Sequence, residues 1–179
     1  MRPNGPQWNA GVDCSWLHGG EGGRMSVELY ATFYVHGDLW AVNVLQVREI
    51  LQRFEIAVVP QGPPAVRGLM NLRGQIVTAL DLATCLGLPR PDDAGTCIVL
   101  KTDTELSRVK WANRELELTG PDPVGLVVDR MGDVMEIDTA RIDATPSNID
   151  PELRVFVRGV VQLDDELLLL LKLMPVLKC

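Results

Sequence analysis

The sequence predicts an all-β domain built from two similar small barrels or sheets around a shared hydrophobic core, with a few short helices. Short apolar runs, separated by Gly, Pro, Asn and Asp, fill most of the 179 residues, as expected for strands joined by turns. The chain also repeats itself, because the stretch that begins at Val66 recurs at Val157 without a gap. Each copy of about 70 residues would bury only a marginal core, so we expect the copies to pack about a pseudo-twofold axis.

The first half of the chain begins with two predicted strands. Residues 29–35 alternate between apolar and polar side chains, and the turn His36–Asp38 leads into a second strand at 39–45. The next segment, 47–54, fits either a helix or a bent strand, because a short apolar run does not distinguish the two.

The stretch 66–82 predicts a β-hairpin. Two apolar runs flank a polar tip, Asn71–Gln75, with Arg73 and Gly74 at its centre. We interpret Gly68 and Gly74 as structural turn residues. After the hairpin, Asp81 is placed to cap a helical turn over 82–86.

The second half predicts strands at 96–100, 124–129 and 131–137, and then a second pair of apolar strands within 157–177 that are joined by a turn at 163–166. Residues 101–123 interrupt it with a long polar segment that we expect to be an extended, mobile loop.

The repeat conserves the scaffold and changes the tip. A shift of 91 positions places Val66-Arg67-Gly68 on Val157-Arg158-Gly159, while the basic tip at 71–74 meets the acidic Asp164-Asp165-Glu166. Because a turn alone does not require arginine, we expect Arg73 to have a task of its own, and its five donors suit a partner molecule.

Composition limits the function classes. A net charge of −7 and a pI near 4.8 argue against nucleic acid or an anionic membrane surface as partner. We see neither a spanning apolar run nor a secretory leader, and we expect a cytoplasmic protein. Its cysteines, which lack metal-site spacing, are expected to be reduced: Cys14, Cys85, Cys97 and Cys179.

Residues 1–25, rich in Gly, Pro and Asn, are expected to form a disordered tail before the domain at 26–179. An alternative is that translation begins at Met25, since codons for the preceding Gly-Glu-Gly-Gly run are purine-rich, like a ribosome-binding site.

Catalysis is not expected. The two histidines lie in the tail and at a turn, and the sequence contains no phosphate-binding loop and no dinucleotide fingerprint. We expect no metal and no cofactor.

Several motifs together resemble the CheW-like domain of bacterial chemotaxis proteins. They extend from about Leu29 to Leu177 and include Ala41-Val42-x-Val44-x-x-Val47-x-Glu49-Ile50, Val66-x-Gly68-x-x-Asn71-Leu72-Arg73-Gly74, and Val124-Gly125-Leu126-Val127-Val128-Asp129. Departures from the family pattern are Thr78-Ala79, where Pro-Val is usual, and the long interruption at 101–123.

The resemblance implies two five-stranded SH3-like β-barrels and a non-catalytic adaptor that joins methyl-accepting chemotaxis receptors to the regulatory domain of a CheA-type histidine kinase. It implies that the receptor's signalling tip docks in a groove between the subdomains, beside Arg73 and Asn71. Glu49 would pair with that arginine, and Val44, Val47 and Val128 would line or support the groove. An adaptor for a pilus-type chemosensory pathway and a small-ligand-binding β-barrel sensor are the alternatives.

Overall fold

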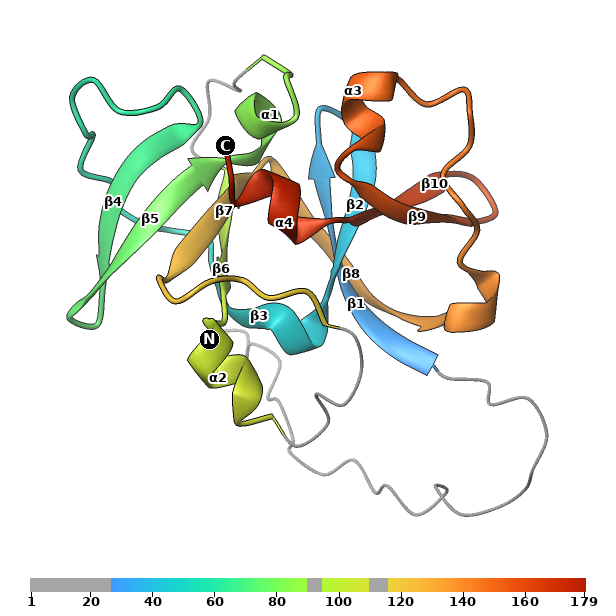
Figure 1. Ribbon diagram of the computed structural model, residues 1–179, viewed down its shortest axis with the longest axis horizontal. Helices are drawn as coiled ribbons and strands as arrows, with labels where there is room; N and C mark the ends of the chain where they lie inside the picture. The colour runs from blue at the N-terminus through green and yellow to red at the C-terminus, as the bar shows by residue number, and fades with distance from the viewer. Residues whose placement is uncertain (1–26, 90–94, 110–115) are drawn as a thin grey trace, which may run out of the picture.

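The computed structural model describes residues 27–89, 95–109 and 116–179, which form two five-stranded sheets side by side (Figure 1). The tail predicted at 1–25 lies outside the described residues. Sheet A has the strand order β8-β1-β2-β10-β9, and sheet B has the order β3-β6-β7-β5-β4.

Sheet A consists of β1 (Val27–Val35), β2 (Asp38–Asn43), β8 (Arg130–Asp138), β9 (Val157–Gln162) and β10 (Leu167–Leu171). Sheet B consists of β3 (Val47–Leu51), β4 (Val66–Leu72), β5 (Gln75–Asp81), β6 (Thr96–Leu100) and β7 (Val124–Val128). The helices are single turns: α1 (Leu82–Cys85), α2 (Asp103–Ser107), α3 (Pro151–Arg154) and α4 (Leu173–Val176), with 3-10 turns η1 (Val44–Gln46) and η2 (Thr139–Arg141).

The two halves of the chain exchange strands. The first half contributes β1 and β2 to sheet A and β3 to β5 to sheet B, whereas the second half contributes β6 and β7 to sheet B and β8 to β10 to sheet A. Replacing each strand by its repeat counterpart converts the order of one sheet into that of the other. The halves are therefore intertwined, and the parallel pairs β2–β10 and β5–β7 each join strands from different halves.

The largest apolar cluster lies between the sheets, as the repeat predicts. Its side chains come from both sheets and from the two helices that follow the repeated hairpins, and they include Phe33, Trp40, Val160 and Leu169 of sheet A, Leu80, Ile98 and Leu126 of sheet B, Leu82 of α1 and Leu173 of α4. Each sheet also encloses a smaller cluster of its own. Removing this surface from water favours the assembled pair of sheets over either alone.

Both sheets curl until their edges touch, but neither closes. In sheet B, Ala57, beyond β3, makes a single bridge to Leu69 of β4, with N–O distances of 2.8 and 2.9 Å. In sheet A, Asp143, beyond β8, makes the same bridge to Val160 of β9. The prediction of five strands per unit is confirmed, while that of closed barrels is wrong, because one bridge per sheet replaces a continuous ladder between the edge strands.

Glycines permit these close approaches. A Cβ on Gly68 would lie 2.3 Å from the carbonyl oxygen of Ala57, and one on its counterpart Gly159 would lie 2.7 Å from Ile142 Cγ2. Gly68 lies within β4, next to a register shift between Val66 and Gly68, so its interpretation as a turn residue was wrong. Strand periodicity alone does not distinguish a glycine at a bulge from a glycine in a turn.

Two further local predictions are decided by the structure. The ambiguous segment 47–54 begins as strand β3, hydrogen-bonded to β6. The helical turn after the hairpin is confirmed as α1, whose first turn is capped by the side chain of Asp81, 2.9 Å from the Thr84 amide.

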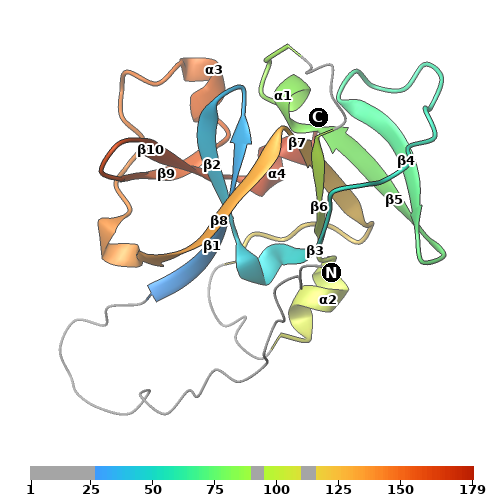
Figure 2. The same cartoon turned by 180° about the vertical axis from the view of Figure 1, so that it is seen from behind.

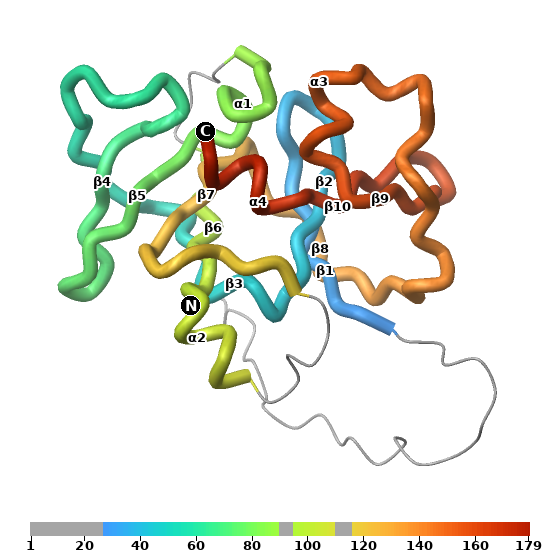
Figure 3. The backbone as a smooth tube through the Cα atoms, in the orientation of Figure 1, coloured from blue at the N-terminus to red at the C-terminus, as the bar shows by residue number. Residues whose placement is uncertain are grey.

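The described parts of 101–123, residues 101–109 and 116–123, contact the rest of the fold at a few positions, and the expected mobility of this segment stays a prediction. Leu106 of α2 is buried. The side-chain Nε2 of Gln46 donates to the backbone carbonyl oxygen of Glu117 at 2.9 Å. The Glu117 carboxylate accepts from the backbone N–H of Leu173, at 2.6 Å, at the start of α4. Residues 116–123 thus cross in front of the molecule as a strap between η1 and α4 (Figure 3).

The curl of sheet B predicts a severe effect for Gly68→Ala. The new methyl group would overlap the Ala57 carbonyl, and φ of +148° is unfavourable for alanine, so we expect a loss of about 2–4 kcal/mol in the free energy of unfolding. Gly87→Ala is the control, because φ there is +75° with open space around it, and only about 1 kcal/mol of strain is expected. Urea unfolding measures both, and equal losses would contradict the role of the close approach.

Candidate partner-binding site

The tip of the β4–β5 hairpin is a two-residue turn. Leu72 pairs with Gln75, and both intervening residues have positive φ, 52° at Arg73 and 87° at Gly74. This is the type I′ arrangement, which twists in the same sense as the flanking strands. The Asn71 carboxamide oxygen accepts from the Gly74 N–H at 2.8 Å and braces the turn. Asn71 therefore shapes the tip, and the prediction of a turn at Gly74 is confirmed.

Arginine is a costly residue in this conformation. A non-glycine side chain in the left-handed region costs about 1–2 kcal/mol, and Asn followed by Gly is the favoured pair in a type I′ turn. Arg73 nevertheless occupies the first position of the turn. Backbone strain at an exposed tip, kept in favour of a particular side chain, suggests a role outside folding.

Glu49 of β3 orients the Arg73 guanidinium. Nη2 of Arg73 lies 3.1 Å from Oε2 of Glu49, as the family resemblance implied. The Arg73 side chain is 78% exposed and that of Glu49 is 20% exposed, so the carboxylate is fixed in the protein while the arginine extends into solvent. An exposed pair of this kind contributes about 0–1 kcal/mol to stability. Its effect is to aim the arginine rather than to hold the fold.

A line of alternating charges connects the tip to α2. The Arg48 guanidinium lies between Glu49, at 3.7 Å, and Glu105, at 3.6 Å, and its Nη1 donates to Oε1 of Gln75 at 2.6 Å. Glu105 also accepts from the backbone N–H of Thr102 at 2.8 Å. These contacts thus connect the hairpin tip, β3 and α2 in the absence of a partner.

Sequence reasoning missed Arg48, Gln75 and Glu105. Neighbouring residues of a regular strand face opposite sides, so a strand pattern does not place Arg48 beside Glu49. The register shift between Val47 and Glu49 leaves Arg48 as an extra residue, and its side chain reaches the same network. A signal for Glu105 was present, because Thr102 followed three residues later by Glu is a capping box, which the structure contains.

The three predicted groove valines occupy different environments. Val128 of β7 is only 2% exposed, so it can support a groove but cannot line one. Val44 of η1 and Val47 of β3 are half-buried and pack against the core shared by the two sheets. Figure 2 shows β3 between the hairpin tip and sheet A, so the partly accessible valines belong to the segment that carries Glu49.

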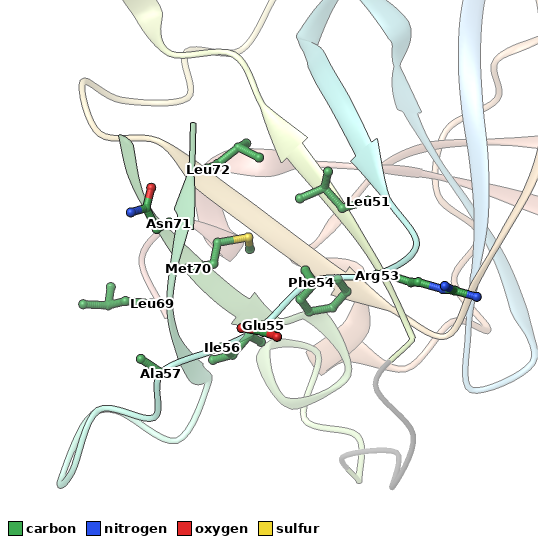
Figure 4. A pocket seen from close by; sticks show the side chains of 10 residues that line it. All are labelled: Leu51, Arg53, Phe54, Glu55, Ile56, Ala57, Leu69, Met70, Asn71 and Leu72. Atoms are coloured by element: carbon green, nitrogen blue, oxygen red, sulfur yellow. The ribbon is translucent and has the colours of Figure 1, made fainter. Parts of the chain in front are cut away.

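A hollow of about 760 Å³ lies at the seam where the edges of sheet B meet (Figure 4). It is lined by Leu51, by 53–57 and by 69–72, and it includes Asn71 beside the tip. Apolar side chains of sheet B's own cluster, among them Phe54 and Met70, form part of its wall. The seam is a feature that the sequence did not indicate, because it depends on how far the sheet curls.

Sheet A does not reproduce the charge pair. The repeat places Asp133 at the position of Glu49 and Asp164 at that of Arg73, so both partners would be acidic. The equivalent strand order and the edge bridge occur in both sheets, whereas the Arg73–Glu49 pair is confined to sheet B. This asymmetry supports a task for Arg73 that the scaffold does not require.

Most of the chain matches a known protein family. Residues 29–178 match the model of the CheW-like domain. The chain belongs to the CheW-like family. It is 29% identical over 152 residues to the chemotaxis protein CheW of Rhizobium meliloti, covering 85% of this chain and 86% of that protein.

Two other similarities agree with this membership. The probable chemotaxis protein CheW of Rhizobium etli is 27% identical over 141 residues, which cover 79% of this chain and 81% of that protein. The crystal structure of the scaffolding protein TtCheW from Thermoanaerobacter tengcongensis shares the fold, with a TM-score of 0.66, 21% identity and coverage of 82% of this chain and 90% of that one.

Within the described residues, no cluster of three or more His, Cys, Asp or Glu side chains could hold a metal ion. The described helices are also too short to cross a membrane.

The strained turn predicts that Arg73→Asn stabilises the CheW-like domain. Asparagine tolerates the left-handed region, so the free energy of unfolding should rise by up to about 1 kcal/mol even though the exposed ion pair is lost. Arg73→Ala removes the same pair without relieving the strain and should not gain stability. Chemical denaturation of both variants tests this, and equal stabilities would show that the turn is not strained.

Proposed function

We propose that this protein is a non-catalytic adaptor that couples methyl-accepting chemoreceptors to a CheA-type histidine kinase. The observation that carries the proposal is the exposed Arg73 guanidinium, held at a strained tip by Glu49 in a CheW-like fold. The named relatives are chemotaxis and scaffolding proteins, which supports the same class of function.

In this proposal the receptor's signalling tip contacts the β3 side of the hairpin. Glu49 occupies part of the guanidinium, and the remaining N–H groups of Arg73 are available for carboxylates or carbonyl oxygens of the partner. Val44 and Val47 supply the partly accessible apolar surface beside it, with Val128 as buried support. Such a contact combines apolar burial with one directional charge, which suits reversible binding of a helical tip.

The kinase regulatory domain would bind elsewhere on the molecule, so that both partners are held at once at the cytoplasmic face of a receptor array. Arg73 should then matter for the receptor and not for the kinase. This separation makes the two halves of the proposal independently testable.

We expect Arg73→Asn to weaken receptor binding by about tenfold to a hundredfold, the effect of losing one or two charge-assisted hydrogen bonds. Binding of the full chain to a receptor signalling-tip fragment, and separately to a kinase regulatory domain, can be measured by calorimetry or pull-down. Since Arg73→Asn is expected to be at least as stable as the parent, lost binding would not reflect lost fold.

Arg141→Ala is the matched control. Arg141 is also an exposed arginine, bonded to the carbonyl oxygen of Gln162 on the sheet A side, and its removal should leave receptor binding unchanged. Equal receptor affinity of the parent and Arg73→Asn would overturn the site assignment. If the parent chain bound neither partner, the adaptor function itself would be wrong.

A further inference from the structure

Two cysteines that are far apart in the sequence, Cys85 and Cys179, meet beside α1 and α4. Cys85 ends α1 and is buried, while Cys179, beyond α4, is exposed. The Sγ of Cys179 lies 3.9 Å from the carbonyl oxygen of Cys85. The Sγ of Cys85 lies 4.0 Å from the carbonyl oxygen of Val176. Figures 1 and 2 show the end of the chain beside α1 in both views.

The repeat explains why they meet here. Helices α1 and α4 are counterparts at the shift of 91 positions, so Val176 is the repeat counterpart of Cys85. A residue that contacts its own counterpart lies close to the pseudo-twofold axis. Cys179 reaches the same place because backbone bonds from Leu177 to Leu173 and from Cys179 to Val176 turn the chain back over α4.

We propose that Cys85 and Cys179 form a reversible disulfide under oxidising conditions, and that this bond locks the two intertwined halves together at the axis. Cys85 ends α1, which follows strand β5 of sheet B. Cys179 follows α4, which in turn follows strand β10 of sheet A. A bond between them would close a loop that contains β6 to β10 and the helices α2, α3 and α4.

The two thiols differ in a way that orders the reaction. Burial, followed by the charge and hydrogen bonding of Cys179, raises the pKa of the Cys85 thiol far above its ordinary value. Cys85 therefore stays protonated and shielded from the solvent, while the exposed Cys179 meets an oxidant first. The pair divides into an accessible thiol and a resolving thiol.

With a peroxide as oxidant, the Cys179 sulfur attacks one peroxide oxygen, which breaks the O–O bond and gives a sulfenic acid and one water. The Cys85 sulfur then attacks the Cys179 sulfur. The S–S bond forms, the S–O bond breaks, and the leaving hydroxide takes the Cys85 proton as a second water. In total, two thiols are oxidised by two electrons to a disulfide, and one peroxide is reduced to two waters.

The third described cysteine provides an internal control. Cys97 lies within β6, is fully buried and has a pKa raised by burial to about 12, so it should keep its thiol throughout. Cys14 lies outside the described residues, and the experiment therefore uses the full chain with Cys14→Ser.

In the test, the full chain with Cys14→Ser is first reduced and then treated with hydrogen peroxide. The protein is next denatured and its remaining thiols are alkylated. We expect two thiols to be lost per molecule, a linked peptide pair containing Cys85 and Cys179, and an unmodified Cys97. Because the bond crosses a long loop, the melting temperature should rise by roughly 5–15 °C and return to its starting value on reduction.

Cys179→Ser, a change at an exposed position, should abolish both the linked peptide and the shift in melting temperature while leaving the reduced protein folded. The proposal would be overturned if peroxide carried Cys179 to a sulfinic or sulfonic acid while Cys85 stayed alkylatable. It would equally be overturned if Cys179 linked only to a second molecule, or if Cys179→Ser showed the same peroxide-induced shift.

Discussion

The curl of sheet B is the constraint on which the rest of the site depends. β3 and β4 are opposite edges of a five-stranded sheet, and a flat sheet would hold Glu49 and Arg73 far apart. The bridge between Ala57 and Leu69 brings the edges together, and Gly68 allows the approach because it has no Cβ. The charge pair is thus a product of sheet curvature. The same curvature without complementary charges occurs in sheet A, which separates the demands of folding from those of function.

Strand exchange and the strap make the two sheets one unit. Each half of the chain leaves its second strand and enters the other sheet, so the shared core cannot be divided without breaking sheets. Glu117 forms a polar link between η1 and the start of α4, and Glu105 connects α2 through Arg48 to the Arg73–Glu49 pair. The segment 101–123 therefore supports the elements on which the proposed receptor contact depends.

Sequence patterns predicted the elements better than their curvature. The repeat indicated two equivalent units, and the Arg-Gly pair correctly located the tip, because both signals can be read from the order of residues along the chain. Closure was predicted wrongly, since it depends on long-range edge contacts that no short pattern records. Two register shifts also escaped the sequence patterns. One lies beside Gly68, which is in a strand and not in a turn, and the other allows Arg48 to reach the charge network. Capping by Thr102 and Glu105 was readable in the sequence and shows that the insertion had a structural signal.

We propose that the Arg73–Glu49 pair serves partner binding and not the fold. A double-mutant cycle with Arg73→Ala, Glu49→Ala and the double variant measures it directly, with unfolding and receptor-tip binding determined on the same four proteins. We expect a coupling energy of at most about 0.5 kcal/mol in unfolding, as for an exposed pair, and of more than about 1 kcal/mol in binding. A coupling present in unfolding and absent in binding would contradict it.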